Sequence, residues 1–527
     1  MSAAALPTML TIQLRTGYKA LLAWVLALGA TMVATTTSIS GLYGTQAKID
    51  SYATAVGTGD ALVALNGRVA GLHTLGGVVA NEFGFLASFA IPLMGISLVA
   101  KMTRKEEESG RLEMLLAGRI GRTAPILAAV ILGAVALLLT AATLFAGLTL
   151  VAVPAGDSLL YAASMAALGF VFAGVAAVVA QVVGHARGVY AAGLATLIVS
   201  YLLRGIGDVL DNPLTWLSPL GWQEKTRAFG QDPRWWPLLV PVAVGLTLAG
   251  VAFVVARHRD LGSALVQRTA GPTRASSSLR TPLGLVIRLH RGSVLGWAAG
   301  AVVVAAAFGS LTQPIIEAVA GNENLAQAMG AAGGSGVDAV LTMSVLLLAL
   351  LCGAYVVHAV GMLRAEETSG RLEGELSGTR SRGSWLGVHA LVVLTGLVVV
   401  AGAGGLTLAL TAAWSTGSPV SSTSIEAVAA YLPATFVLGA LALLLFALLP
   451  RLQPLAWLLY GVAALVAYLG DPLQLADPLL WLSPFQLVGA PPQEPATAGT
   501  LLMLCALTIV LVGAAFVGFR RRDIPRG

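Results

Sequence analysis

Long apolar runs, separated by short polar segments, dominate this chain. A run of about 20 apolar residues is long enough to cross a lipid bilayer as an α-helix, and a helix satisfies its own backbone hydrogen bonds there. The pattern predicts an all-α polytopic membrane protein. We expect about twelve transmembrane helices, at residues 20–41, 77–100, 124–150, 158–183, 188–209, 237–256, 293–312, 338–361, 386–413, 426–449, 454–470 and 499–519.

Two further segments, 6–19 and 281–291, precede the first and seventh spans. Each begins near a proline, a residue suited to a helix start, and we expect two short helices lying along the membrane surface. The first span is longer than the apolar region of a signal peptide and lacks a small-residue cleavage pattern, so it is expected to be retained.

Composition supports this interpretation. Hydrophobic residues make up 57% of the 527 residues and charged residues 11%, whereas soluble domains carry about 25% charged residues. The two cysteines, Cys352 and Cys505, both lie in predicted spans, which excludes a disulfide framework and a cysteine-based zinc site. No metal site is expected.

The basic charges fall mainly on one side of the predicted topology. With a cytoplasmic N-terminus, 25 of the 31 Lys and Arg residues lie inside, as the positive-inside rule requires. Both termini are then cytoplasmic, and the net charge of +6 marks topology rather than nucleic-acid binding. The six basic residues outside are Lys48, Arg68, Arg204, Lys225, Arg227 and Arg234.

The chain contains an internal repeat. Segment 106–113 reads Glu-Glu-Glu-Ser-Gly-Arg-Leu-Glu and recurs at 366–373 with seven identities in eight. A Trp-Leu-Ser-Pro text runs from Trp216 to Pro219 and again from Trp481 to Pro484. The dipeptide Arg259-Asp260 recurs as Arg522-Asp523. The same landmarks therefore appear twice in the same order.

This repetition predicts two tandem six-helix halves. Residues 1–256 form the first half, 257–280 a cytoplasmic linker and 281–527 the second half. Because six is even, both halves enter the membrane from the same side, and a pseudo-twofold axis along the membrane normal relates them. The seam between the halves is where we expect a substrate path.

The inner repeat predicts a short helix on the membrane surface. Leu112, Leu115 and Leu116 recur at helical spacing, next to fixed charges; the second copy has a weaker apolar stripe. A solvated turn joining two spans is the simpler alternative. It does not explain why the same text occurs in both halves.

This text resembles the coupling-helix region of ABC-2-type exporter permeases. The two-copy arrangement is similar to the fused twelve-span permeases of bacterial polyketide-antibiotic and multidrug exporters. The resemblance implies that segments near 104–118 and 364–378 dock onto cytoplasmic ABC ATPase subunits, two copies in all, which bind ATP and Mg²⁺. It assigns this docking to Glu106, Glu107, Gly110, Arg111, Glu113, Glu366, Glu367, Gly370, Arg371 and Glu373. The Gly-Arg pair stands where many relatives have Gly-Thr.

The chain itself carries no phosphate-binding loop, because none of its lysines follows a glycine and precedes Ser or Thr. We therefore expect a transport subunit without its own ATPase site, in a bacterial plasma membrane, that exports hydrophobic compounds such as antibiotics. The family pattern implies a cavity lined by the second and fifth spans of each half. Its candidates are Phe83, Phe85, Phe89, Tyr190, Tyr201, Tyr355, Trp457, Tyr460 and Tyr468. For any one of them lipid or helix contact is the better explanation, and only the family pattern favours the group.

Two alternatives stay open. A proton-coupled secondary transporter also commonly has six plus six spans, but it needs buried acids, and the ionisable residues in the predicted spans lie near their ends. A membrane-embedded enzyme such as a lipid transferase needs converging His, Asp or Glu side chains at one depth, and the sequence shows no such group.

Overall fold

The computed structural model describes residues 5–56, 63, 66–116, 121–260, 264–265, 274, 276–320, 336–378, 380–469 and 476–523. Within these ranges it is helical and contains no β-strand. Eleven helices are long and apolar enough to cross a membrane, and one further apolar helix, Leu455–Tyr468, is shorter. The predicted all-α polytopic membrane fold is confirmed. The span predicted at 454–470 corresponds to the shorter helix.

The chain forms two compact units, Met1–Gly271 (unit 1) and Pro272–Gly527 (unit 2). The division falls within the segment 257–280 that the sequence assigns to the linker. Half of that segment lies outside the described residues, as do residues 117 and 118 of the first predicted docking segment.

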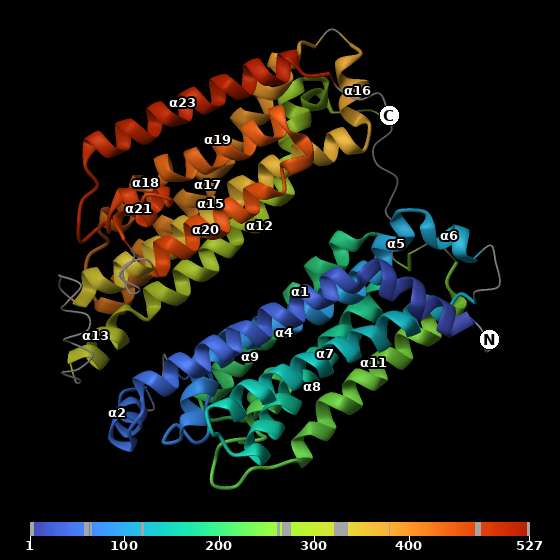
Figure 1. Cartoon of the computed structure of the whole chain (residues 1–527), viewed down its shortest axis with the longest axis vertical. Coiled ribbons are helices and arrows are strands. Elements are labelled where there is room, and N and C mark those ends of the chain that lie inside the picture. The colour runs from blue at the N-terminus through green and yellow to red at the C-terminus, as the bar shows by residue number, and fades with distance from the viewer. Residues whose placement is uncertain are drawn as a thin grey trace. The chain divides into compact units, whose positions relative to one another are not determined.

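Unit 1 is a bundle of helices with short elements at both ends. Figure 1 shows α5 and α6 at one end of this unit and α2 at the other. Its helices are α1 (Ala5–Leu42), α2 (Gln46–Val56), α4 (Leu75–Met102), α5 (Arg104–Glu108), α6 (Arg111–Leu116), α7 (Ala124–Leu150), α8 (Ala155–Val182), α9 (Ala186–Val209), η1 (Pro213–Leu217), α10 (Pro219–Glu224), η2 (Trp236–Leu238) and α11 (Leu239–His258).

The core of unit 1 is built around α8, which packs against α4, α7, α9 and α11. Glycines let α4 and α8 approach closely. A Cβ added at Gly95 would lie 2.5 Å from the carbonyl oxygen of Gly169 on α8, so a side chain there would force the helices apart. Small residues serve this purpose in membrane proteins because helices surrounded by lipid associate through close packing.

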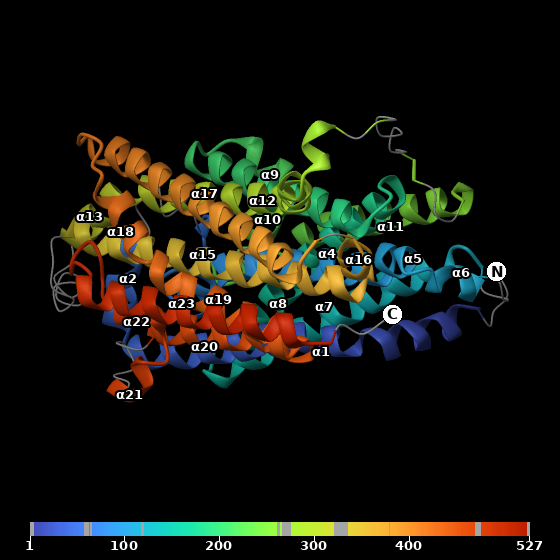
Figure 2. The ribbon, with the colours of Figure 1, turned by 90° about the horizontal axis from the view of Figure 1, so that it is seen from above.

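Unit 2 repeats several helix pairs of unit 1, with α12 against α17 and α19 against α23, but α17 barely contacts α19, whereas α7 packs against α8. Figure 2 shows α15 between α17 and α19, and α15 packs against both. The helices are η3 (Ser277–Arg280), α12 (Pro282–Ser310), α13 (Thr312–Ala320), α15 (Gly336–Thr368), α16 (Arg371–Leu376), α17 (Arg382–Thr416), α18 (Thr423–Ala430), α19 (Leu432–Leu448), η4 (Pro450–Leu452), α20 (Leu455–Leu469), α21 (Asp477–Leu480), α22 (Pro484–Val488) and α23 (Ala498–Arg521).

The segments at 6–19 and 281–291 are not separate surface helices. They are the first turns of the continuous helices α1 and α12. In unit 1 the buried Gln13 explains this, because its side-chain amide donates to the carbonyl oxygens of Met102 at 3.0 Å and Pro125 at 2.9 Å. These bonds hold the start of α1 against the end of α4 and the start of α7.

Candidate functional site

Both copies of the repeated text fold into a helix end, a tight turn and a short helix. In unit 1 the turn at Gly110 joins α5 to α6, and in unit 2 the turn at Gly370 joins α15 to α16. The two glycines have φ angles of 72° and 73°, a left-handed conformation that glycine adopts without steric cost. No atom lies within 4 Å of a Cβ built at either position. The backbone angle, not crowding, therefore requires glycine here.

An arginine after each turn binds a glutamate before it. Arg111 donates from Nε and Nη2 to the two carboxylate oxygens of Glu106, at 2.8 Å each. Arg371 binds Glu366 in the same way at 2.7 and 2.8 Å. Both arginines are more than half exposed, so the pairs add little to stability. Their two-pronged geometry fixes the orientation of the turn.

Glu107 is buried and faces the bundle. Its side chain is 7% exposed and accepts from Nη2 of Arg259, with both carboxylate oxygens 2.8 Å from that nitrogen. The buried Arg104 also binds Glu107, at 2.9 Å, and donates from Nε to the carbonyl oxygen of Ala180 at 2.6 Å. The repeated text is thereby fastened to the C-terminal ends of α11 and α8.

Glu367 makes the equivalent connection in unit 2 with one arginine. Nη2 of Arg522 lies 2.7 Å from Oε1 of Glu367, and Nη1 of the same guanidinium donates to the carbonyl oxygen of Phe446 at 2.8 Å. The guanidinium also lies over the rings of Phe446 and Phe519, 5.4 Å from each centroid. Arg522 thus links the turn to the ends of α19 and α23 by itself. The recurring Arg-Asp dipeptides were the sequence signal for Arg259 and Arg522.

Glu108 has a structural partner that explains why the repeat differs at this position. Its Oε1 accepts the backbone N–H of Ala186, at 2.8 Å, at the start of α9. The first N–H groups of a helix lack partners within the helix, and the preceding residue, His185, makes no capping bond with its side chain. Thr368, the counterpart of Glu108, instead bonds the carbonyl oxygen of Arg364 in its own helix.

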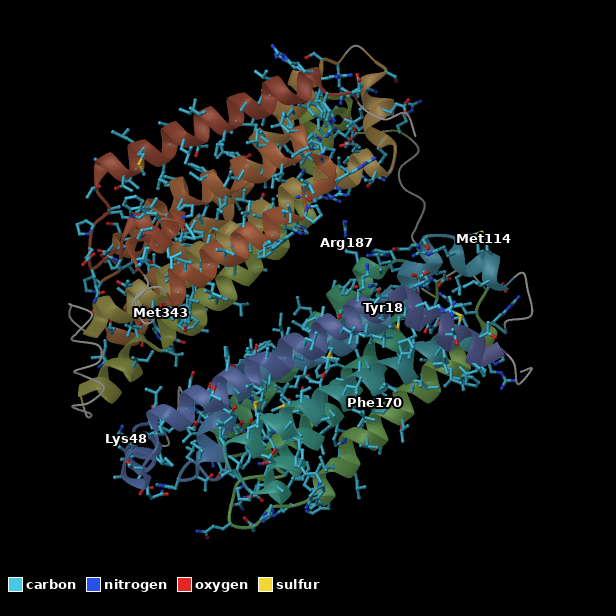
Figure 3. All side chains as sticks on the ribbon, in the orientation of Figure 1. Tyr18, Lys48, Met114, Phe170, Arg187 and Met343 are labelled. Atoms are coloured by element: carbon cyan, nitrogen blue, oxygen red, sulfur yellow. The ribbon has the colours of Figure 1, made fainter. Side chains whose placement is uncertain are left out.

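The short helices α6 and α16 leave charged surfaces exposed. Each rests on its bundle through one buried leucine, Leu112 in unit 1 and Leu372 in unit 2. Figure 3 shows Met114 at the α6 end of unit 1, far from Lys48, and Met114 is 72% exposed. We call the exposed residues of these helices the docking faces: Arg111, Glu113 and Met114 in unit 1, and Arg371, Glu373 and Gly374 in unit 2.

The ten predicted docking residues therefore divide into two groups. Glu107 and Glu367 face inward in buried ion pairs, whereas the others lie at the turns or on the docking faces. Contact of any of them with an ATPase stays a prediction.

The Trp-Leu-Ser-Pro texts form matching elbows. In both units the buried serine hydroxyl donates to a carbonyl of the preceding apolar helix at 2.7 Å, Ser218 to Ser200 and Ser483 to Ala463. The prolines Pro219 and Pro484 each begin the next short helix. The tryptophans are partly exposed, Trp216 at 38% and Trp481 at 71%, as interfacial tryptophans commonly are.

The aromatic candidates in unit 1 gather between α4 and α9. The ring of Phe89 lies 5.6 Å from Phe85 and 4.8 Å from Tyr201. Phe83 is buried, and Tyr190 is 39% exposed on another part of α9.

In unit 2 the aromatic candidates lie on α15 and α20. Tyr355 is buried, and the Tyr460 hydroxyl donates to the carbonyl of Leu350 at 2.8 Å. Trp457 packs edge-on against Tyr460, and Tyr468 is 45% exposed. Substrate contact by any of the nine aromatic residues stays a prediction.

Unit 1 also contains a buried charged cluster that the sequence did not reveal. Nη1 of Arg204, near the end of α9, lies 3.1 Å from Oε1 of Glu224 on α10. Asp208 is 2% exposed and accepts from the hydroxyl of Thr215 at 3.1 Å. Gly67 leaves the room for this cluster, because a Cβ there would lie 1.9 Å from the Glu224 carboxylate.

Burial raises the pKa of Glu224 to about 8, and the nearby Asp208 adds to this effect while Arg204 opposes it. This raised pKa keeps the Glu224 carboxyl mostly protonated at neutral pH. Arg204 and Glu224 line a small cavity of about 50 Å³.

Two bundles of membrane-crossing helices with a repeated turn element are the architecture of a membrane transport protein. The family model described as "Multidrug efflux system permease Rv1217c, C-terminal domain" matches residues 6–257 and 279–520. The multidrug efflux system permease protein Rv1217c of Mycobacterium tuberculosis (strain ATCC 25618 / H37Rv) is 32% identical over 524 residues, covering 98% of this chain and 94% of that protein. The chain belongs to this family of multidrug efflux permeases.

The two buried glutamates predict different sensitivities to loss of their arginines. Arg522→Met removes the ion-pair partner seen at Glu367 and a helix-end hydrogen bond, and breaking a buried pair in this way costs about 3–5 kcal/mol. Arg259→Met leaves Glu107 paired with Arg104. We expect a clearly larger fall in the thermal unfolding midpoint for Arg522→Met, measured on the purified full chain in detergent. An equal fall in both variants would contradict this account.

The raised pKa of Glu224 predicts a pH-dependent stability. A free glutamate has a pKa near 4.5, so between that pH and about 8 the folded chain holds a proton that the unfolded chain has lost. The free energy of unfolding should fall by up to about 1.4 kcal/mol per pH unit in this window and level off above it. Glu224→Gln should flatten the slope of the unfolding midpoint, followed by tryptophan fluorescence from pH 5 to 9. Asp211→Asn, at an exposed neighbouring ion pair, is the control and should keep the slope.

Proposed function

We propose that the chain is the permease subunit of an ATP-driven exporter of hydrophobic compounds. Two copies of a separate cytoplasmic ABC ATPase bind ATP and Mg²⁺ and dock on α6 and α16. The chain supplies the docking faces and the membrane-crossing helices, and it catalyses no reaction itself. The relative's name, a multidrug efflux system permease, supports the class of substrate.

One observation carries this proposal: in each unit an exposed charged face is attached rigidly to the ends of two membrane helices. The Arg111–Glu106 pair fixes the turn, and Glu107 next to it is bound by Arg259 and Arg104. A displacement of α6 by a partner is thereby passed to α11 and α8. A plain connecting turn needs no such buried attachment.

Unit 2 transmits force along the matching path. A displacement of α16 reaches Glu367 through the turn at Gly370, and Arg522 passes it to α23 and α19. Because the ion pairs are buried, solvent and salt weaken them little. Hydrolysis in the two ATPase subunits would then change the tilt or spacing of α8 and α11 in unit 1 and of α19 and α23 in unit 2.

The charges at the helix ends support the proposed orientation. Arg257 and His258 end α11, and Arg520 and Arg521 end α23. These residues lie at the same end of their units as the repeated text, because the ion pairs join them to it. By the positive-inside rule we propose that this end is cytoplasmic and that the membrane is a bacterial plasma membrane.

A second candidate is a proton-coupled secondary transporter, and the Asp208–Glu224 pair favours it. Buried carboxyl groups, one of them with a raised pKa, are the kind of group that proton relays use. The pair lies at the end of α9 and in α10, and it has no acidic counterpart in the repeat of unit 2. We therefore rank this function second.

The docking faces provide the sharpest test. Glu113→Arg combined with Glu373→Arg reverses one exposed charge on each face without touching a described ion pair. We expect loss of the ATPase activity that co-purifies with the tagged chain, and at least a tenfold loss of Nile red efflux from cells. The chain should remain in the membrane with an unchanged unfolding midpoint.

Glu426→Arg, an exposed charge on α18 at the other end of unit 2, is the matched control and should change neither activity. Efflux that survives ATP depletion but stops when the proton gradient is collapsed would overturn the first proposal in favour of the second. Full co-purifying ATPase activity in the double variant would overturn the docking assignment alone.

A further inference from the structure

Unit 2 contains an apolar cavity of about 410 Å³ between α15, α17, α19 and α23. This volume lies within the range of about 300–1,000 Å³ that is typical of sites for small molecules. None of the nine aromatic candidates from the sequence lines it. The cavity is therefore a different location from the one that the family pattern implies.

The floor of the cavity reaches the core of the unit. Val356, Leu363, Leu397 and Ala440 line it and are buried. A groove that only faced lipid would be walled by exposed side chains. Here exposed leucines occur at the rim, such as Leu391 at 51%, so an occupant would be enclosed from below and held at its sides.

The lining chemistry defines the occupant. None of the lining residues is charged, and the hydroxyl of Thr508 is already bonded to the carbonyl of Leu504 at 2.9 Å. Recognition can then come only from apolar area and from ring contacts with Phe436 and Phe516, which both line the space. Aromatic side chains favour flat, ring-containing partners over saturated acyl chains.

The position of the cavity separates it from a similar one in unit 1. The unit 2 cavity lies along the C-terminal halves of α15 and α23, the middle of α19 and the first half of α17, toward the end that carries the repeated text. Unit 1 has a cavity of about 320 Å³ between α7, α8 and α11 that includes Leu238 and Val242 at the opposite end of α11. The cavities between equivalent helices therefore lie at different positions along the helices in the two units.

We propose that the unit 2 cavity is an entry site for uncharged, ring-containing apolar compounds taken from the leaflet next to the repeated text. This inference rests on the proposed export function, which supplies the direction of transport. Because no charged residue lines the cavity, it offers no partner for a charged substrate. We therefore expect a substrate that partitions into the lipid before it binds. An acyl chain of a phospholipid is the competing occupant.

Nile red, an uncharged planar dye, is a suitable probe. We expect saturable binding, one dye per chain, to the purified full chain in phosphatidylcholine nanodiscs without ATP. Ala390→Trp fills the cavity from α17 and should weaken this binding at least tenfold. Ala166→Trp is the matched control, because Ala166 is an equally half-buried alanine in the unit 1 cavity, and it should bind as the unaltered chain does.

Leu394→Ala widens the cavity at its rim and should bind Nile red at least as tightly as the unaltered chain. Opposite effects of a filling and a widening substitution separate occupation of the cavity from a folding defect in the tryptophan variant. Binding that matches empty nanodiscs would show that acyl chains fill the cavity and would overturn the inference. Equal loss in Ala390→Trp and Ala166→Trp would also overturn it. Cells in which the unaltered chain exports no Nile red would instead contradict the proposed function, since the binding measurement needs neither a partner nor an energy source.

Discussion

The buried carboxylates Glu107 and Glu367 impose the constraint that organises the cytoplasmic end of each unit in the proposed topology. A charge removed from water must be matched by an opposite charge and by hydrogen bonds, and both glutamates lie where helices end. Arginines just beyond the last long helix donate to these carboxylates, and carbonyl oxygens at the end of another helix accept from the arginines that bind them. Satisfying the carboxylate therefore brings three elements together, and the turn and its charged face follow from that arrangement.

Much of the architecture follows from hydrophobic pattern alone. Eleven long apolar helices lie where runs of apolar residues predict them, and α20 is short because Pro450 and Pro454 precede it and delay its start. The repeated text correctly marked a special element. Its inward-facing members were not evident, because the Glu107–Arg259 pair joins residues 152 positions apart, and spacing along the chain carries no information about such a contact. From the sequence, Arg204 was likewise expected to be an outer basic residue. Its contact with Glu224, 20 positions along the chain, is seen only in the structure.

The two units share the elbows but differ in the side chains that pack beside them. The elbow hydrogen bonds align Ser200 with Ala463 and Ser218 with Ser483. Four residues after the first pair, Arg204 therefore corresponds to Ala467. Six residues after the second pair, Glu224 corresponds to Gly489. One unit thus holds a buried contact between Arg204 and Glu224 where the other holds two small residues, and apolar packing replaces a polar cluster at that position. The raised pKa of Glu224 is therefore a property of one half of the duplication.

The one mismatch in the eight-residue repeat has a further meaning. Glu108 supplies an acceptor for the backbone N–H of Ala186, whereas the matching helix of unit 2 follows two prolines, which have no N–H to offer. A chimaera that exchanged the two eight-residue segments would look nearly silent, with a single change in each half. It would nevertheless strip a helix start of its acceptor in one half and add a carboxylate in the other, where the matching helix follows two prolines. At this position the two halves are not interchangeable, because their helix starts present different backbone groups, although the repeated text differs by a single residue.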